Sequence, residues 1–334
     1  MVRRPCVPSL HGFEMCRGQC MRVFLAGATG AIGRPLVAQL LQAGHNVVGT
    51  TRSQTSAATL RSAGAEAVVL DAFDSAALRD AVLTAAPDVV IHQLTSLGGT
   101  LKPRRYGEWI ATTNRLRTEV TPTLLNAAHE AGAHRAIVQS VSFMLAFDGP
   151  RVGDETSPDA RDEPPPYGPV VRANLAMESA VTTHPGLEGL VLRYGYFYGP
   201  GTSIGRGGQQ YEDLRRRRIP IVGTGEGHFS LIHVDDAAAA TVRALDHGTT
   251  GIYNIVDDEP APQHLWMPAL AAAAGGKPPR HVPSWLARIA AGSFIPKMAE
   301  HQRGSSNLKA RTELDWTPRY SSWRDGFAAP GALG

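Results

Sequence analysis

The sequence predicts an α/β fold in which a doubly wound parallel sheet is followed by a smaller C-terminal lobe. Two observations support this prediction. Short apolar runs typical of buried strands alternate with amphipathic helical segments from residue 22 to about residue 193. A glycine-rich turn with the sequence GATGAIG joins the first strand to the first helix. Right-handed crossovers between parallel strands then place helices on both faces of the sheet.

The expected elements follow one another in a regular rhythm. The expected strands are Val23–Ala26, Asn46–Thr51, Ala67–Leu70, Val89–His92, Ala136–Ser140 and Leu187–Arg193, with a later strand at Ile252–Val256. The expected helices after the first are 56–63, 75–85, 106–132 with a kink at Pro122, and 172–183. The segment from Gly149 to Pro169 is rich in proline and acidic residues and is interpreted as a surface loop.

Three segments of the chain have different expected roles. Residues 1–20 contain all three cysteines and are expected to be a disordered extension; no apolar stretch typical of a signal peptide is present. Residues 21–200 are expected to form a Rossmann-type nucleotide-binding domain, with a strand returning near 251–256. Residues 201–330 are expected to form mainly the substrate-binding lobe.

Composition excludes several classes of protein. The net charge is +3 without a large basic block, so nucleic acid is not expected as the main partner. The one basic cluster, Arg215 to Arg218, is interpreted as a helix end that faces solvent or a substrate phosphate. No apolar run reaches membrane-spanning length, no acidic, His or Cys set has metal-ligand spacing, and the expected location is the cytoplasm.

The glycine turn predicts a dinucleotide site. Gly27 permits the tight turn, Gly30 lets the backbone approach a pyrophosphate, and Gly33 allows close packing of helix and strand. Thr29, Ala31 and Ile32 complete the turn. The pyrophosphate would then lie on the partly positive N-terminus of the helix.

Several further motifs appear in a fixed order, and together they resemble the extended short-chain dehydrogenases/reductases of the NAD-dependent epimerase/dehydratase type. The matching pieces are GATGAIG, the strand ending VVIHQ, Asn114 in the long helix, the strand ending at Ser140, LRYGYFYGPG and HVDDAAAA. The resemblance implies NAD(H) or NADP(H) as the cofactor, with substrate bound between the nucleotide domain and the C-terminal lobe. It also allows a homodimer, and it gives HVDDAAAA a structural role.

The chain departs from the family at the proton-transfer residues. The family uses a Ser or Thr together with a Tyr and a Lys four residues apart on one helix face, where the Lys lowers the pKa of the phenol. Here Tyr167 is followed at that spacing by Val171. An alignment through Glu178 instead puts Asn174 at the Lys position and Val170 at the Tyr position. The chain therefore resembles the atypical members of the family.

The resemblance places cofactor contacts at the ends of successive strands. Thr51 and Arg52 end the second strand, and because no acidic residue is there, a guanidinium beside a 2′-phosphate favours NADP(H) over NAD(H). The alternative for Arg52 is a solvated surface residue without a cofactor contact. Asp71 is either an adenine contact or a helix cap, and its neighbour Ala72 is also an expected cofactor contact. The other expected cofactor contacts are Leu94, Thr95, Ser96, Asn114, Tyr194 and Tyr196, for which loop, surface or packing roles are the alternatives.

The expected catalytic residues are Ser140 or Ser142, Tyr167 and Asn174. Either serine could bind a substrate oxygen or merely cap the strand. Tyr167 could donate a proton from the loop or be a surface aromatic residue. The leading hypothesis is an NADP(H)-dependent ketoreductase acting on a small-molecule carbonyl, such as a secondary metabolite. The alternatives are a sugar-nucleotide epimerase or dehydratase and a non-catalytic NADP(H)-sensing protein.

Overall fold

The central feature of the fold is a seven-stranded parallel sheet, seen in a computed structural model that describes residues 20–98 and 103–334. The strand order is β12-β7-β5-β4-β1-β2-β3. The strands are β1 Arg22–Ala26, β2 Asn46–Thr51, β3 Glu66–Val69, β4 Val89–His92, β5 Arg135–Val141, β7 Glu188–Tyr194 and β12 Gly251–Ile255. The predicted doubly wound sheet is confirmed, whereas the expectation for residues 1–20 lies outside the described residues except at Cys20.

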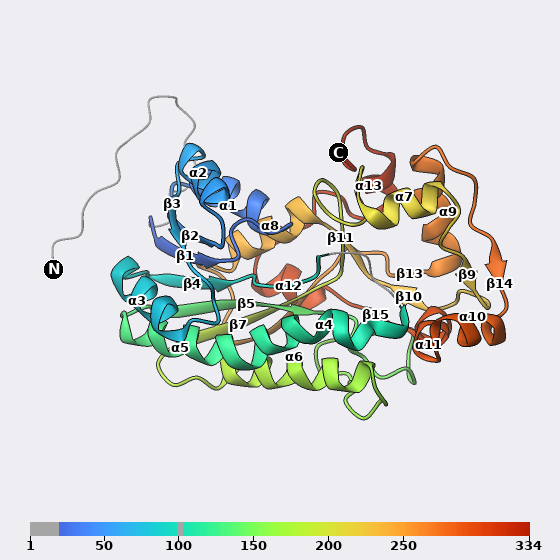
Figure 1. Cartoon of the computed structure of the whole chain (residues 1–334), viewed down its shortest axis with the longest axis horizontal. Helices are drawn as coiled ribbons and strands as arrows, with labels where there is room; N and C mark the ends of the chain where they lie inside the picture. Colours follow the sequence, from blue (N-terminus) through green and yellow to red (C-terminus); the bar gives the residue numbers. More distant parts are fainter. Residues whose placement is uncertain (1–19, 99–102) are drawn as a thin grey trace.

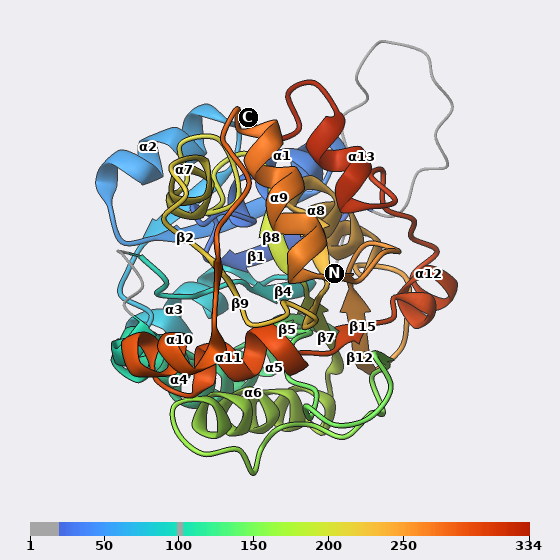
Figure 2. The ribbon, with the colours of Figure 1, turned by 90° about the vertical axis from the view of Figure 1, so that its right-hand side faces the viewer.

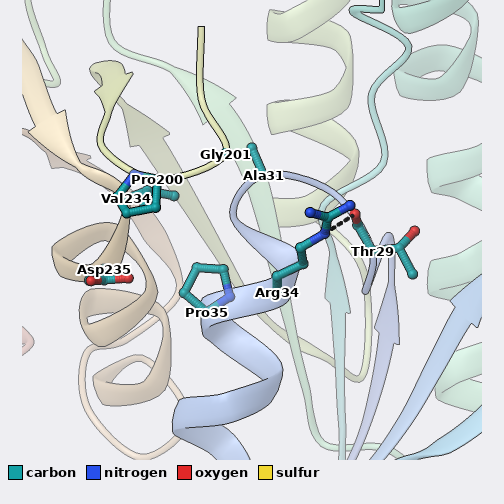
Figure 3. Close-up of a pocket in the computed structure, with 8 residues that line it drawn as sticks. All are labelled: Thr29, Ala31, Arg34, Pro35, Pro200, Gly201, Val234 and Asp235. Carbon is teal, nitrogen blue, oxygen red and sulfur yellow. Dashed lines mark hydrogen bonds between the residues drawn. The ribbon is translucent and has the colours of Figure 1, made fainter. Parts of the chain in front are cut away.

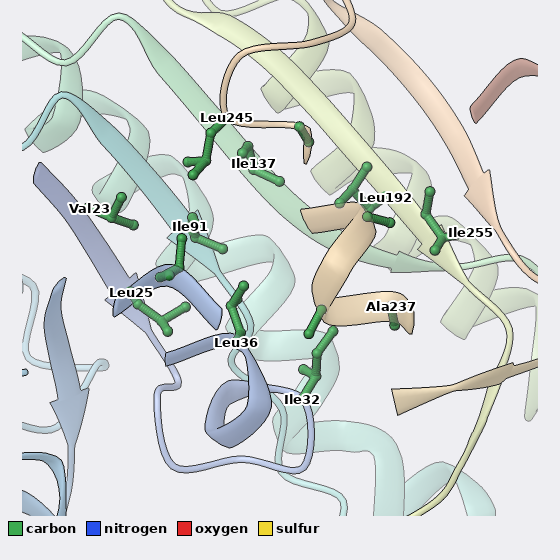
Figure 4. Close-up of a cluster of buried hydrophobic side chains, with 14 of the residues drawn as sticks. Val23, Leu25, Ile32, Leu36, Ile91, Ile137, Leu192, Ala237, Leu245 and Ile255 are labelled. Atoms are coloured by element: carbon green, nitrogen blue, oxygen red, sulfur yellow. The ribbon is translucent and has the colours of Figure 1, made fainter. Parts of the chain in front are cut away.

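Helices cover both faces of the sheet (Figure 1). One face carries α1 (Gly33–Gln42), α2 (Gln54–Ser62) and α8 (Val234–Arg243). The other face carries α3 (Ser75–Ala85), α4 (Tyr106–Arg115), α5 (Thr121–Glu130) and α6 (Tyr167–Thr182). Successive strand residues point to opposite faces, so Leu25 and Ile91 pack against α1 (Figure 4), while Phe24 and Val90 pack toward α3 and α5.

The long helix expected over residues 106–132 is one continuous run, but it departs from regular α-helix before Pro122 rather than at it. Residues Leu116–Val120 form a π-helical turn between α4 and α5, in which the Thr121 N–H donates to the carbonyl of Leu116, five residues back. Pro122 lies in the first turn of α5, where a missing N–H costs little.

Helix α6 begins at Tyr167, five residues before the predicted start. The sequence prediction treated Pro169 as part of a loop that ran on from Gly149. Pro169 instead occupies the first turn of the helix, where proline is well tolerated because the N–H there has no intrahelical acceptor. Tyr167 therefore belongs to the helix, and the prediction that it lies in the loop is wrong.

The C-terminal half also builds a region of short elements beyond the carboxyl edge of the sheet (Figure 2). Its helices are α7 (Gln209–Arg215), α9 (Gln263–Ala273), α10 (Ser284–Ala291), α11 (Phe294–His301) and α13 (Trp323–Ala328), whereas α12 (Leu308–Glu313) packs against the edge strand β12. Its two-stranded pairs are β8 (Tyr196–Tyr198) with β11 (Leu231–His233), β9 (Ile221–Val222) with β14 (His281–Val282), and β10 (His228–Phe229) with β13 (Ala261–Pro262). In a fourth pair, β15 (Gly304–Ser305) joins β6 (Val152–Gly153), which comes from the first half of the chain.

Two smaller features of this half match their predictions. Arg215 to Arg218 lie exposed at and just after the C-terminal end of α7, as predicted for a solvated helix end. His233 caps α8 through its ring nitrogen, which accepts from the Asp235 N–H, as expected for a structural HVDD motif. No helix among the described residues is long and apolar enough to cross a membrane.

Candidate active site

The glycine turn after β1 has a shape that only glycine permits at two of its positions. Gly27 has a φ of +96°, and a Cβ there would lie 2.8 Å from the main-chain carbon and oxygen of Gln93. At Gly33 a Cβ would lie 2.2 Å from the carbonyl oxygen of Gly27. Gly30 is exposed, and its Cβ would meet only the Gly27 oxygen, at 3.4 Å. The turn therefore leaves an open approach to the backbone at Gly30.

A cavity of about 300 Å³ lies beside this turn (Figure 3). It is lined by Thr29, Ala31, Arg34, Pro35, Pro200, Gly201, Val234 and Asp235. The Arg34 Nε donates a hydrogen bond of 3.2 Å to the carbonyl of Thr29, which holds the guanidinium over the turn. Helix α1 has no acidic residue in its first turn, so its partial positive charge is uncompensated there. This chemistry fits an anionic diphosphate.

The next expected cofactor residues lie on the same edge of the sheet as the glycine turn. Leu25 is in register with Gly49, and Thr51 with Val69, so Arg52 and Asp71 follow neighbouring strands. Arg52 is exposed, and its side chain makes no hydrogen bond or ion pair within the described residues. Asp71 accepts from the Phe73 N–H, while Asp74 caps α3. The exposed Asp71 carboxylate therefore already accepts a hydrogen bond from its own loop.

The loop after β4 is held by hydrogen bonds from its backbone N–H groups to neighbouring side chains. The Leu94 N–H donates to Nδ1 of His92, and the Ser96 N–H donates to Oγ1 of Thr113 on α4 at 2.9 Å. Leu94, Thr95 and Ser96 are half-buried. Asn114 is also half-buried, and its Oδ1 accepts a hydrogen bond from Nη1 of Arg117 at 3.1 Å. Ala72, the other expected contact, is buried in the core.

Ser140 on β5 and Ser142, which directly follows β5, have different surroundings. Ser140 is fully buried, and its hydroxyl lies 2.6 Å from Oε1 of Glu178 and 3.4 Å from Oδ1 of Asn174. The Asn174 Nδ2 donates to the carbonyl of Val170, one helical turn back. Ser140 and Asn174 are therefore tied into an internal network. The Ser142 hydroxyl is also buried but has no hydrogen-bond partner in the described chain.

Tyr167 is 3 % exposed, so its interpretation as a surface aromatic residue is wrong. Its ring packs against Phe147 and against Phe294 of α11, with centroids 5.6 and 4.9 Å apart. Its hydroxyl donates to the carbonyl of Phe143. Burial in this apolar cluster raises the pKa of the phenol well above its usual value. The sequence pattern missed this because α11 is more than 120 residues away along the chain.

Tyr194, the last residue of β7, and Tyr196, the first residue of β8, also differ in their surroundings. Tyr194 belongs to the apolar core, and its hydroxyl lies 2.6 Å from Oγ1 of Thr241 and 3.1 Å from Nε2 of Gln93. Tyr196 stacks on Phe143, with ring centroids 4.3 Å apart, and its hydroxyl donates to Oε1 of Gln302. Burial raises the pKa of both phenols, so both tyrosines are neutral at ordinary pH.

Sequence reasoning missed two buried groups near this edge. His92 ends β4, and burial lowers the pKa of its ring to about 4. Arg117 lies in the π-helical turn and is 5 % exposed. A lone histidine or arginine in the sequence gives no signal of burial, and the π-helical turn that buries Arg117 was not predicted. No group of three or more acidic, His or Cys side chains in the described part of the chain could hold a metal ion.

The fold and the glycine turn are those of dinucleotide-binding α/β proteins, a class in which ligands bind at the carboxyl edge of the sheet. Residues 23–256 match the model of the NAD dependent epimerase/dehydratase family, and the chain belongs to that family. It is an NAD(P)-dependent oxidoreductase of the extended short-chain dehydrogenase/reductase type.

Curated relatives include several reductases. The chain is 43 % identical over 308 residues to a 3-diazoavenalumate denitrifying reductase from a Streptomyces species, covering 92 % of this chain and 99 % of the relative. It is 25 % identical to a 4-hydroxy-2-methyl-3-oxo-4-farnesyl-3,4-dihydroquinoline-1-oxide ketoreductase of Stigmatella aurantiaca, covering 81 % and 79 %. It is 26 % identical to a 2-alkyl-3-oxoalkanoate reductase of Stenotrophomonas maltophilia, covering 76 % of each chain.

Solved structures support the fold. A UDP-glucose 4-epimerase of Thermotoga maritima matches with a TM-score of 0.73 at 20 % identity, covering 91 % of this chain and 96 % of the other. A Thermus thermophilus UDP-glucose 4-epimerase in complex with NAD matches with a TM-score of 0.71 at 23 % identity, covering 94 % and 98 %.

Proposed function

We propose that this protein is an NADP(H)-dependent reductase that replaces an aromatic diazo group of a small molecule by hydrogen. The observation that carries the proposal is the pair Tyr167 and Val171 on α6. A phenol that donates to the Phe143 carbonyl, with valine four residues on, is a weak general acid. A reaction that needs no enzyme-derived proton fits such a site. The relative at 43 % identity is named for a diazo substrate.

The residues around the glycine turn would hold the dinucleotide. Gly27, Gly30 and Gly33 shape the diphosphate site, and Arg34 lies over it. Arg52, exposed and without a side-chain partner in the described chain, would meet a 2′-phosphate and so favour NADP(H). When bound, the reduced cofactor supplies a hydride. The protein supplies binding and orientation.

The proton balance distinguishes the candidate reactions. An arenediazonium cation that gains a hydride becomes the arene and releases N₂, so no proton has to be added. A ketone that gains a hydride becomes an alkoxide and must be protonated. The buried Tyr167 has a raised pKa and no neighbouring lysine on its helix face, so it is poorly suited to the second task.

A carbonyl substrate is the second candidate, and one observation favours it. The Ser142 hydroxyl is buried at the end of β5 without a hydrogen-bond partner in the described chain. A substrate carbonyl oxygen there would satisfy it, because an unpaired buried hydroxyl costs about 1–3 kcal/mol. Two of the relatives are named as a ketoreductase and an oxoalkanoate reductase. In this case the proton would come from Ser142, Tyr167, an ordered water or the substrate's own phenol.

The test follows NADPH oxidation with two matched probes, 4-carboxybenzenediazonium and 4-acetylbenzoate. The proposal predicts protein-dependent conversion of the first to benzoate and N₂, above a control without protein. Conversion of only the second to its alcohol would overturn the diazo assignment and support the ketoreductase. The Ser142→Ala variant should then lose about tenfold or more in kcat/KM, since one hydrogen bond to the reacting oxygen is lost.

The two remaining alternatives predict different outcomes. A non-catalytic sensor would bind NADPH and NADP⁺ but oxidise NADPH with neither probe. A sugar-nucleotide epimerase would interconvert UDP-glucose and UDP-galactose without net oxidation of NADPH. Either result would replace the reductase proposal.

A further inference from the structure

Arg117 is a buried cation without a counter-ion in the described part of the chain. Arg117 is 5 % exposed, and none of the described carboxylates lies within ion-pair distance of it. Its one side-chain hydrogen bond in the described chain runs from Nη1 to Oδ1 of Asn114, which is a neutral acceptor. Most buried charges in proteins are paired, because an uncompensated buried charge is costly.

The neighbouring groups do not neutralise it. Burial lowers the pKa of Arg117 to about 10, which still leaves it protonated in roughly 1000-fold excess at pH 7. His92 is neutral because its pKa is lowered, and Tyr106 is neutral because burial raises its pKa. Glu178 lies within electrostatic reach, but its two oxygens already bind Arg193. One positive charge is left over.

The geometry of the Arg117 guanidinium shows what kind of acceptor would fill its unused hydrogen-bonding positions. Arg79, Arg115 and Arg193 each bind a carboxylate of this chain through the edge formed by Nε and Nη2. In Arg117 only Nη1 is used, so this same edge has no acceptor in the described chain. A planar carboxylate matches that edge with two parallel hydrogen bonds.

The position of Arg117 connects it to the candidate site. It lies in the π-helical turn, which packs against α6, the helix that begins with Tyr167. Arg117 lies within electrostatic reach of Tyr106, and Tyr106 lies within reach of Tyr167 and Tyr196. The Tyr106 ring packs on Phe294 at 5.2 Å, beside Tyr167. Single turns of π-helix within α-helices are frequent at functional sites.

We propose that Arg117 is the substrate-anion receptor of this enzyme, binding a carboxylate of the small-molecule substrate through its Nε and Nη2 hydrogens. This inference rests on the proposed function for the identity of the site and adds the substrate class: an organic acid rather than a neutral compound. Arg117 selects and orients the substrate and takes no part in the hydride transfer itself.

The first test measures binding without turnover. The full-length protein with NADP⁺ is titrated by calorimetry with 4-hydroxybenzoate and with its methyl ester. The acid should bind, and Arg117→Met should raise its Kd at least tenfold while leaving the Kd of the ester unchanged. Arg117→Lys should retain part of the binding. Arg115→Gln, an exposed residue on the same helix that pairs with Glu119, is the matched control and should change neither ligand.

A second readout separates binding from a structural role. The Arg117→Met variant removes an uncompensated buried charge, so its melting temperature should be equal to or above that of the parent protein. Equal losses of acid and ester binding, unchanged acid binding, or a strongly lowered melting temperature in both Arg117 variants would overturn the inference. The proposed function is tested separately. It is overturned if neither 4-carboxybenzenediazonium nor 4-acetylbenzoate is reduced, whether or not acid binding depends on Arg117.

Discussion

The carboxylate of Glu178 holds the guanidinium of Arg193 at two points inside the protein. The Nε–Oε1 distance is 2.8 Å, the Nη2–Oε2 distance is 2.6 Å, and the side chains are 3 % and 7 % exposed. The same carboxylate accepts from Ser140. This network joins α6 to β5 and β7, and so fixes the ends of the two strands that precede Ser142 and Tyr196.

Breaking this pair should strongly destabilise the fold. Glu178→Gln leaves the Arg193 charge buried without a partner, which should lower the free energy of unfolding by about 3–5 kcal/mol. The measurement is urea unfolding followed by circular dichroism. Glu119→Gln, which breaks an exposed pair with Arg115, is the control and should cost less than about 1 kcal/mol. Similar losses in both variants would contradict the role assigned to the buried pair.

The cofactor preference should depend on Arg52. Arg52→Ala should weaken binding of NADPH and NADP⁺ by roughly tenfold or more, because a charge-assisted hydrogen bond to the 2′-phosphate is lost. Binding of NADH and NAD⁺ should change little. Calorimetry with the four cofactors measures the effect, and Arg61→Ala on α2, whose Nη2 donates to the Ala67 carbonyl, is the control. Equal weakening of all four cofactors would argue against a 2′-phosphate contact.

Two glycines of the turn should separate folding from cofactor binding. The Gly30→Ala variant has room for its Cβ, so its melting temperature should equal that of the parent protein. Its affinity for the dinucleotide should fall, because the added methyl group lies where the diphosphate would approach the backbone. Gly27→Ala should lower both, because its Cβ would collide with Gln93 at a φ of +96°.

The control for the backbone conformation alone is Gly44→Ala. Its φ is +86°, and a Cβ there would meet nothing within 4 Å. It should cost about 1 kcal/mol of stability and leave cofactor binding intact. If Gly30→Ala binds the dinucleotide as well as the parent protein does, the turn does not approach a diphosphate.

Acid should destabilise the protein through His92. Its pKa is about 4 in the folded state and near 6.5 when unfolded, because burial penalises the charged ring and Arg117 adds repulsion. Between these values the unfolded chain binds the extra proton. Stability is therefore lost as the pH falls from about 6.5 to about 4, by up to roughly 3 kcal/mol.

The measurement compares urea unfolding of the parent protein and of His92→Gln at pH 7 and pH 4. The glutamine variant cannot take up this proton, so its stability should fall less over the same interval. Because carboxyl groups titrate in both proteins, the contribution of His92 is the difference between their losses of unfolding free energy from pH 7 to pH 4. Parallel curves would show that His92 does not titrate as described.

Local patterns predicted most of the fold. Runs such as Val89–His92 and the turn from Gly27 to Gly33 carry their signal within a few neighbouring residues, and the predicted strands and turn are observed. The predictions failed at two prolines: Pro122 was expected to kink a helix, and Pro169 was expected to lie in a loop. In both places proline occupies a first helical turn, which depends on where the helix starts.

The sequence by itself determined the parallel sheet, the glycine turn and the family, because strand periodicity and glycine conformations are local properties. Only the tertiary structure decided which polar and aromatic side chains are buried and which of them have hydrogen-bond or ion-pair partners. It ties Ser140 to Glu178, leaves the Ser142 hydroxyl without a partner in the described chain, and buries Tyr167 against Phe294. It also leaves Arg117 charged without a counter-ion among the described residues. Burial and pairing of these groups arise from contacts between distant segments, and no spacing along the chain encodes them.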